Sequence, residues 1–329
     1  MNASAFHRRR DQREDAPRAL LCVSIDCERD KGPAWRVRRP ASFRAVHDGI
    51  AQRLQPLFAA FGVKPTYLLS PEVIRDDASA ECLAALDGAH ELGTHLHAEY
   101  VAPGIDDDAE SEIFQAALPP ALERAKLQAL TALFVDRFGR RPRSFRAGRF
   151  GIGPASLPIL IDLGYSVDSS VTPLLDWRRA GAGAPSFRAA PLGPYRPDPA
   201  APARPGRGAL WEVPITIRRG PWQRLPVIGA RLGHRLPHRW LRPTWGRARD
   251  LVALAREVLA EADAAPDRTA PAILNVMFHN VEVTPATSPY AATQSQADAI
   301  LRRLAALLAF ARDAEIPSVG LGDLPELLA

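Results

Sequence analysis

The sequence predicts an α/β fold in which helices join parallel strands. Short apolar runs of strand length alternate with longer stretches whose apolar residues recur at helical spacing, and turn residues separate the two kinds of segment. A chain of 329 residues with 47% hydrophobic content can bury roughly 75% of the surface that its unfolded state exposes. Three cysteines without Cys-x-x-Cys spacing exclude a disulfide scaffold and a zinc ribbon.

The first part of the chain predicts three strands and two helices. Short apolar runs predict buried strands over 19–25, 65–69 and 91–97. Apolar residues three and four positions apart predict helices over 43–61 and 79–87. A serine precedes the longer helix as its N-cap and a glycine follows it, which fixes both of its ends.

The middle of the chain continues the same alternation. A helical region over 110–138 contains a break at Pro119-Pro120, because proline interrupts helical hydrogen bonding. A strand over 144–146, a helix over 154–163 and a strand over 165–168 follow. These segments extend the predicted series of parallel strands.

The alternation breaks at 171–210, where proline, alanine and glycine predict a long structured loop. Beyond it the pattern predicts strands over 210–217, 272–278 and 318–319, and helices over 249–262 and 293–312. We therefore expect a single domain that carries an irregular Pro/Arg/Trp-rich insertion at about 171–249.

The charge balance is mildly positive, with 42 Lys and Arg against 37 Asp and Glu, which weakly favours anionic partners. Residues 1–18 mix both signs of charge without periodicity and predict a disordered tail.

No apolar segment of a signal peptide follows the first basic residues, and no run reaches the ~20 apolar residues of a membrane span. We therefore expect a cytoplasmic protein without a transmembrane segment.

Several predicted strands end in chemically reactive side chains. These residues are Asp26, Glu28, His95, His97, Arg146, Asp168 and His279. Each has a plain alternative: a turn cap, a solvated charge or a satisfied core histidine. The carboxyl ends of parallel strands meet at one edge of a sheet, so we expect these residues to surround one pocket.

Metal-assisted hydrolysis is the chemistry that fits this set. A carboxylate and two imidazoles supply three ligands for a divalent ion such as Zn²⁺, with a position open for water or substrate: Glu28, His95 and His97. Asp26 is placed to take a proton from water and His279 to give one to the leaving group. A cationic Arg146 would keep Asp26 ionised.

Five segments resemble, in order, the motifs of the polysaccharide deacetylases, specifically the chitooligosaccharide-deacetylase-like group of carbohydrate esterases. They are 24–28, 91–97, 144–151, 165–170 and 277–280. The third, Ser-Phe-Arg-Ala-Gly-Arg-Phe-Gly, is the most specific match. The resemblance runs from about Ala19 to Val319 and implies a distorted (β/α) barrel of about seven parallel strands, a catalytic domain at 19–329 and a divalent metal, usually zinc.

The resemblance also implies roles for the residues at the strand ends. Asp26 would be the base, His279 the acid and Glu28 a metal ligand, while Arg146 and Asp168 would orient the catalytic pair. The chain departs from the family at two places. Cys27 separates the two acids of the first motif, and the second motif has His97 two positions after His95 and a glutamate, Glu99, where the second histidine usually stands. Either His97 or Glu99 would complete the metal site, and strand geometry favours His97.

Residues 218–249 hold nine arginines and three tryptophans but no acidic residue. A solvated insertion beside the pocket is the plain interpretation. Peripheral contact with an anionic membrane, or with a lipid- or nucleotide-carried sugar, is the functional one. Nucleic acid is disfavoured because no recognised nucleic-acid-binding module surrounds the segment.

The sequence therefore predicts a metal-dependent hydrolase that removes an acyl group, foremost acetyl, from an N-acylated sugar in a glycan or glycan precursor. Two alternatives stay open. One is a catalytically inactive protein that binds a glycan or its carrier on the same barrel, and the other is a hydrolase of a small non-sugar amide.

Overall fold

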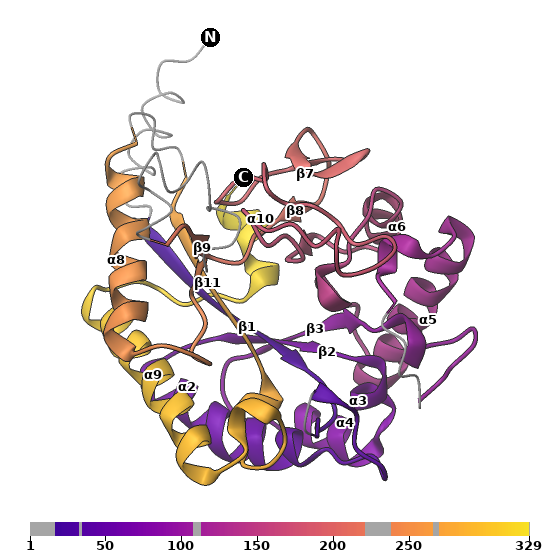
Figure 1. Ribbon diagram of the computed structural model, residues 1–329, viewed down its shortest axis with the longest axis horizontal. Coiled ribbons are helices and arrows are strands. Elements are labelled where there is room, and N and C mark those ends of the chain that lie inside the picture. The colour runs from indigo at the N-terminus through magenta and orange to yellow at the C-terminus, as the bar shows by residue number, and fades with distance from the viewer. Residues whose placement is uncertain (1–16, 33–34, 108–112, 221–237, 266–269, 329) are drawn as a thin grey trace.

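The computed structural model describes residues 17–32, 35–107, 113–220, 238–265 and 270–328. Its centre is a curled, seven-stranded parallel sheet in the order β11-β1-β2-β3-β4-β5-β8 (Figure 1). The strands are β1 (Ala19–Cys27), β2 (Pro65–Leu69), β3 (Glu91–Leu96), β4 (Ser144–Ala147), β5 (Val167–Asp168), β8 (Trp211–Glu212) and β11 (Ala272–His279). The predicted distorted (β/α) barrel is confirmed.

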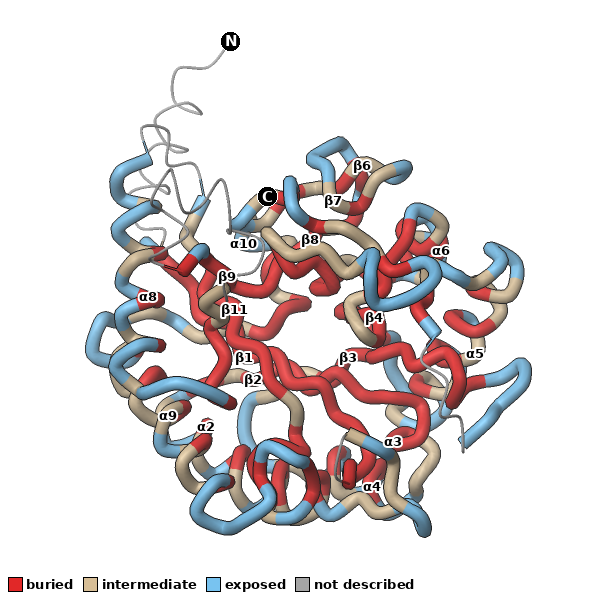
Figure 2. The backbone as a smooth tube through the Cα atoms, viewed as in Figure 1, coloured by how far each residue is buried: buried red, intermediate tan, exposed pale blue. Residues whose placement is uncertain are grey.

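The sheet is the core of the molecule because its central strands are buried on both faces (Figure 2). All nine residues of β1 are buried, and they belong to an almost continuously apolar run, as expected for a strand of a covered parallel sheet. Past the edge strand β8, the Thr216 N–H donates to the Asn275 carbonyl of β11 at 3.2 Å. The chain therefore returns to the first strand and nearly closes the barrel.

Helices cover the outside of the curled sheet (Figure 1). The longest are α5 (Pro120–Phe138), α8 (Ala248–Asp263) and α9 (Gln294–Asp313). The shorter ones are the π-helix η2 (Ala45–Leu54), α2 (Gln55–Phe61), α3 (Pro71–Arg75), α4 (Asp77–Ala84), α6 (Ser156–Asp162) and α10 (Leu324–Leu327). Single 3₁₀ turns occupy Ala98–Tyr100, Gln115–Ala117, Gly148–Phe150, Asn280–Glu282, Pro289–Ala291 and Leu321–Asp323.

Prolines explain the main differences from the predicted elements. The strand expected over 210–217 is divided into β8 and β9 (Ile217–Arg218), with Pro214 between them. Proline has no N–H to donate to a strand ladder. The strand expected at 318–319 is a single bridge between Ser318 and Leu21, directly after Pro317.

The segment 171–249, predicted to be an irregular insertion, contributes partly to regular structure. It supplies β8 to the main sheet and forms two short antiparallel pairs, β6 (Pro197–Asp198) with β7 (Ala201–Pro205) and β9 with β10 (Arg239–Trp240). Part of this segment, 221–237, lies outside the described residues, and so do residues 1–16 of the predicted tail.

Strand register brings the chemically important residues together. Asp26 of β1 is paired with His279 of β11, and His95 of β3 is paired with Arg146 of β4. All four lie at or near the carboxyl ends of neighbouring strands. The predicted convergence of these strand ends is therefore a consequence of the parallel pairing.

Candidate metal centre and catalytic pocket

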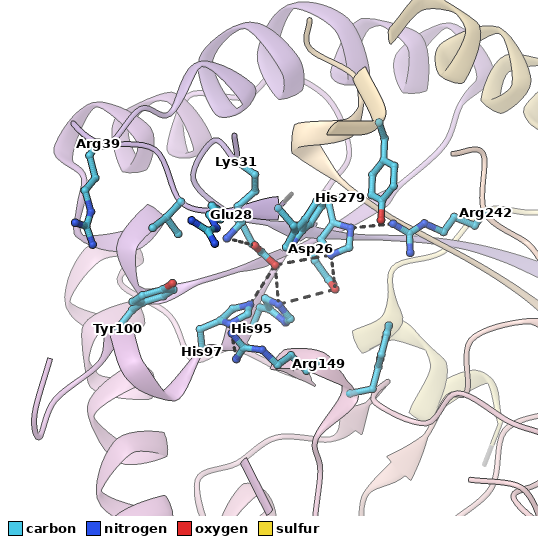
Figure 3. A pocket seen from close by; sticks show the side chains of 15 residues that line it. Asp26, Glu28, Lys31, Arg39, His95, His97, Tyr100, Arg149, Arg242 and His279 are labelled. Carbon is cyan, nitrogen blue, oxygen red and sulfur yellow. Dashed lines mark hydrogen bonds and ion pairs between the residues drawn. The ribbon is translucent and has the colours of Figure 1, made fainter. Parts of the chain in front are cut away.

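A cavity of about 650 Å³ opens at the carboxyl ends of the strands (Figure 3). Its lining includes the five residues expected to carry the chemistry, Asp26, Glu28, His95, His97 and His279. All of them come from β1, β3 and β11 or from the residues that directly follow these strands. The structure therefore gathers residues that are more than 250 positions apart in the sequence around one space.

Three of these side chains have the geometry of a metal site. Ligand atoms of Glu28, His95 and His97 lie within 4.8 Å of one another, and all three residues are buried. Glu28 Oε1 is 3.1 Å from His97 Nε2 and 3.4 Å from His95 Nε2. One carboxylate and two imidazoles are a donor set that suits Zn²⁺ and related divalent ions.

The outer nitrogen of each histidine has an acceptor that fixes the ring. His95 Nδ1 is 3.1 Å from the backbone oxygen of Arg146, and His97 Nδ1 is 3.6 Å from Glu99 Oε1. Burial lowers the pKa of His97, but Glu28 and Glu99 raise it to about 9, so without a metal the ring carries a proton at neutral pH. The Nε2 atoms of both rings face Glu28 Oε1, where a divalent ion would take the place of that proton. Metal-binding histidines usually have such an outer partner, so these residues fit a divalent cation.

Glu99 lies on the side of the His97 ring that faces away from Glu28. Arg149 Nη2 donates to Glu99 Oε1 at 2.8 Å. Burial raises the pKa of Glu99, but hydrogen bonds and charge from His97 and Arg149 lower it to about 2. Of the two candidates that the sequence left open, His97 is the one that lies in the cluster that could hold a metal ion, and Glu99 lies behind it.

The third motif segment, 144–151, packs closely against this centre. Gly148 begins the 3₁₀ turn Gly148–Phe150, and a Cβ at this position would lie 2.5 Å from the Leu96 oxygen and 3.2 Å from His97 Nδ1. Only glycine allows that approach. The residue therefore lets the segment carry Arg149 to Glu99 beside the His97 ring.

The backbone and the carboxylate of Glu28 are both held. Its N–H donates to Asn280 Oδ1 at 2.9 Å, and Asn280 Nδ2 donates to its carbonyl at 3.0 Å. Lys31 Nζ lies 2.7 Å from Glu28 Oε2, and both side chains are almost fully buried. Burial raises the pKa of Glu28, but the positive charges of Lys31 and His97 bring it well below the ordinary value.

Asp26 forms an ion pair with Arg146 at 2.6 Å beneath the pocket. Burial raises the pKa of Asp26, but Arg146, with smaller contributions from His95 and His279, leaves it below the ordinary value. Asp26 is therefore ionised at neutral pH. Its Oδ2 is 3.9 Å from both His95 Nε2 and His279 Nε2, so the carboxylate faces the proposed metal position and the opposite wall.

His279 is oriented by a carboxylate of its own. Its Nδ1 lies 2.8 Å from Glu282 Oε1, and Glu282 in turn accepts hydrogen bonds from Arg242 and Thr244. Burial raises the pKa of Glu282, but the charge of Arg242 and the bond to His279 lower it. The Nδ1–H of the imidazole is directed at this anion, and Nε2 faces the pocket.

Asp168 does not line the cavity. It is fully buried on β5, where Ser170 Oγ donates to it at 2.5 Å, and it is paired in register with the buried Glu212 of β8. Its charge acts on Arg146 through space, without a hydrogen bond between them in the described structure. The orienting role that the resemblance implies for Asp168 stays a prediction.

Cys27 points away from the pocket into the apolar core, where burial raises the pKa of its thiol well above the ordinary value. It is not among the residues of the candidate metal cluster. Successive side chains of a strand point to opposite faces. The single residue between Asp26 and Glu28 therefore leaves both carboxylates on the same face.

Three side chains that line the cavity or hold one of its residues were not found in the sequence: Lys31, Arg242 and Glu282. Lys31 is three residues after Glu28, and Glu282 is three residues after His279. This three-residue spacing was the sequence feature that could have identified both residues. A charge three positions from another is far more often solvated, so the signal has little specificity without the fold.

The described part of the Arg/Trp segment contributes to the pocket and to the helix surface. Arg242 lines the cavity, and Trp245 is half exposed and lies edge-on to Tyr290 at 5.4 Å. Arg218 and Arg239 form ion pairs with Glu261 and Glu257 of α8. Among the described residues, no helix has the length and hydropathy needed to cross a bilayer.

Comparison with protein-family models gives no match, and comparison with curated proteins gives none. Solved structures do match. A candidate glycoside hydrolase/deacetylase from Parabacteroides distasonis has a TM-score of 0.63 and 13% identity over 95% of this chain and 71% of that one. A GH57-type branching enzyme from Pyrococcus horikoshii has a TM-score of 0.54 and 11% identity over 95% and 71% of the two chains.

A candidate polysaccharide deacetylase from Mycobacterium smegmatis matches with a TM-score of 0.51 and 14% identity over 95% of this chain and 90% of that one. Identities this low carry the architecture and not the reaction. The chain has a polysaccharide deacetylase-like fold, as its motifs predict.

Proposed function

We propose that this protein is a metal-dependent hydrolase that removes an acetyl group from the nitrogen of an N-acetylated sugar. The observation that carries the proposal is the buried cluster of Glu28, His95 and His97 in one cavity with Asp26 and His279. A fold shared with deacetylases and glycosidases does not choose between these reactions. The choice rests on the donor set and its two flanking proton-transfer groups.

Each side chain has a defined part in the hydrolysis. A divalent ion held by Glu28, His95 and His97 would supply Lewis acidity to the acyl oxygen and to the attacking water. Asp26, ionised beside Arg146, takes one proton from the water as its oxygen bonds to the acyl carbon. His279 gives a proton to the amide nitrogen as the C–N bond breaks, leaving acetate and the free amine. Glu282 stabilises the protonated imidazole before that transfer.

The walls of the cavity suit a sugar ring. Trp35 lies edge-on to His279 with ring centroids 5.0 Å apart and contacts Tyr290 at 5.3 Å. Both aromatic rings line the pocket, as do Tyr100 and Phe150. Aromatic faces supply apolar area with a polar edge, which supports a carbohydrate substrate over a simple amide.

The test is acetate release from N-acetylated sugars by protein loaded with Zn²⁺, with and without a chelator. We expect chelation to abolish release and Asp26→Asn to lower kcat by about 10²–10⁴-fold. Asp313→Asn, which changes an exposed carboxylate on α9, is the matched control and leaves the rate unchanged. Metal-independent release, or an active Asp26→Asn variant, would contradict the proposal.

The same reactions are assayed for new reducing ends, because one of the similar structures is a branching enzyme. Cleavage of glycosidic bonds without acetate release would replace the deacetylase proposal with a glycosidase. Binding of the sugar without either product would favour the inactive glycan-binding protein.

A further inference from the structure

Two exposed aromatic side chains contact each other beside the mouth of the cavity. Trp245 is 50% exposed and Tyr290 is 36% exposed. Their rings meet edge-on, with centroids 5.4 Å apart and planes at 87°. Tyr290 lines the cavity, whereas Trp245 is not one of its lining residues. The pair therefore extends the aromatic surface of the cavity beyond its mouth.

A series of ring contacts joins this pair to the proposed catalytic acid. The Trp35 ring lies 5.0 Å from the His279 ring and 5.3 Å from the Tyr290 ring. Tyr290 in turn contacts Trp245. Trp35 and Tyr290 both line the cavity. Each ring thus touches the next, from the imidazole inside the cavity to the exposed indole.

Trp35 reaches its place in this series through an unfavourable backbone conformation. Its φ is +61°, in the left-handed region that bulky residues rarely adopt. Such a conformation persists only where the surroundings hold it, and it is found preferentially at functional sites. Lys31 and Val37, on either side of Trp35 in the chain, form an antiparallel bridge. The loop therefore holds the indole against His279 and Tyr290.

The loop that carries Trp245 is also fixed. Arg303 of α9 donates to the carbonyl of Pro243 at 2.6 Å and to that of Thr244 at 2.8 Å. The Arg242 guanidinium packs on the Trp245 ring, 4.5 Å from its centroid. The indole is thus held in place although half of its surface is exposed. A ring that is fixed before binding loses little entropy when a ligand covers it.

These rings suit a sugar unit better than an alkyl chain. A pyranose has a face of C–H bonds that packs on an aromatic ring and a rim of hydroxyl groups that stays among polar groups and water. The polar guanidinium of Arg242 lies against the Trp245 ring. The chain neighbours of Trp245 are Thr244 and Gly246. Neither enlarges the apolar surface, as the burial of an alkyl chain would require.

The proposed reaction fixes the direction in which the substrate extends. His279 gives its proton to the amide nitrogen, which is bonded to the sugar ring, while the acyl oxygen faces the candidate metal centre. The sugar ring therefore lies on the His279 side of the cavity, where Tyr290 lines the wall. Arg242, which packs on Trp245, lies on that same side (Figure 3). The next unit of a sugar chain would reach Trp245.

We propose that Tyr290 and Trp245 form a second sugar subsite on the His279 side of the cavity, which binds the unit adjoining the one that loses its acetyl group. The inference rests on the proposed function and names the residues that set its preference for chain length. A contact made equally in the bound substrate and the transition state lowers KM and leaves kcat nearly unchanged. The two rings therefore favour a disaccharide over a monosaccharide through KM.

The test compares substrates that differ in the group next to the acetylated sugar. Acetate release by the Zn²⁺-loaded protein is measured from the methyl and octyl glycosides of N-acetylglucosamine and from the methyl glycoside of N,N′-diacetylchitobiose. Allowing for its two acetyl groups, we expect kcat/KM to be about tenfold higher for the disaccharide than for the methyl monosaccharide, through a lower KM.

Two results of this comparison would overturn the subsite. Equal kcat/KM values for the disaccharide and the methyl monosaccharide would show that no second unit is bound, and they would leave the deacetylase proposal intact. An octyl glycoside that gains as much as the disaccharide would show that the surface selects apolar groups and not a sugar.

Variants assign the preference to the two rings. We expect Trp245→Ala and Tyr290→Leu each to lower the preference for the disaccharide about tenfold through KM, whereas Trp245→Phe, which keeps a ring, retains part of it. Leu327→Ala removes another exposed apolar side chain, on α10 and outside the cavity lining, and keeps the preference of the wild-type protein. A preference that is unchanged in Trp245→Ala would overturn the subsite.

Calorimetry separates the two proposals if no sugar is hydrolysed. Such a result contradicts the proposed function, and binding of the diacetylchitobiose glycoside is then measured directly. Binding that is weakened about tenfold in Trp245→Ala and kept in Leu327→Ala supports the subsite. Absence of binding, or equal binding by these two variants, overturns it.

Discussion

Arg146 Nη1 lies 2.6 Å from Asp26 Oδ1, and both side chains are almost completely buried although 120 positions separate them in the sequence. The same guanidinium donates to Ser24 Oγ, Ser169 Oγ and the Ser169 carbonyl. The arginine thus joins β1, β4 and the segment after β5 beneath the pocket. The same side chain therefore stabilises the barrel and keeps Asp26, the proposed base, ionised.

Replacing Arg146 with methionine should therefore destabilise the protein by about 3–5 kcal/mol, because Asp26 is left as an uncompensated buried charge. Chemical denaturation at pH 7 measures the loss. The double variant Asp26→Asn/Arg146→Met should recover much of it, because no buried anion remains. An Arg146→Met variant as stable as the wild-type protein would show that the ion pair makes no net contribution.

Metal affinity distinguishes a ligand from a residue that orients a ligand. We expect Glu99→Gln to weaken zinc binding about 10–100-fold, the range for a lost outer partner of a metal-bound histidine. His97→Gln should weaken it more, because it removes a ligand atom that lies 3.1 Å from Glu28 Oε1. Competition with a fluorescent chelator measures both affinities. A greater loss in Glu99→Gln than in His97→Gln would make Glu99 the ligand.

The parallel sheet could be predicted because its strands are buried on both faces. The apolar runs that become β1, β2 and β11 are visible in the sequence for that reason. The strands at one edge of the sheet could not be predicted in this way. β5 and β8 are two residues long and depend on pairing with distant segments, which local periodicity does not encode.

The sequence could predict those site residues that lie at the carboxyl ends of strands. Asp26, His95 and His279 lie on strands, so the rule that parallel strands end together placed them correctly in one pocket. Partners from outside the strands could not be found this way. Glu282 is in a 3₁₀ turn and Arg242 is in a loop, and which carboxylate each cation meets depends on tertiary packing.

The buried pair of Asp168 and Glu212 predicts a pH-dependent stability. Burial, together with the negative charge of Asp168, raises the pKa of Glu212 well above its ordinary 4.5. The folded state therefore retains a proton that the unfolded state releases. This contribution is fully present below about pH 4.5 and is lost as pH rises toward the folded pKa, at about 1.4 kcal/mol per pH unit.

Glu212→Gln keeps a hydrogen-bonding side chain but cannot ionise, so it should remove this slope. Urea denaturation from pH 5 to 8 measures the free energy of unfolding, and the difference between wild-type and variant proteins isolates the residue. Glu326→Gln on α10, where the carboxylate is mostly exposed, is the control. Its free energy of unfolding should change with pH as that of the wild-type protein does. If the free energies of unfolding of Glu212→Gln and wild-type protein differ by the same amount at every pH from 5 to 8, Glu212 does not retain the extra proton in the folded state.

Lys31 predicts a stability change that depends on metal. Its ammonium group is 2.7 Å from Glu28 Oε2, inside the cavity wall. Burial lowers the pKa of Lys31, but Glu28 and Glu72 raise it above its ordinary value, so it is a cation at neutral pH. Lys31→Met leaves the Glu28 carboxylate without this compensation, which should cost about 3–5 kcal/mol when no metal is bound.

A divalent cation held by Glu28, His95 and His97 would supply the missing positive charge. We therefore expect Zn²⁺ to raise the Tm of Lys31→Met by more than it raises the Tm of the wild-type protein, because metal binding then also relieves the buried anion. Glu28→Gln/Lys31→Met removes both charges, so it should recover stability without metal and lose the zinc response. An equal zinc-induced rise in Tm for Lys31→Met and the wild-type protein would mean that the lysine does not balance the charge at the Glu28 position.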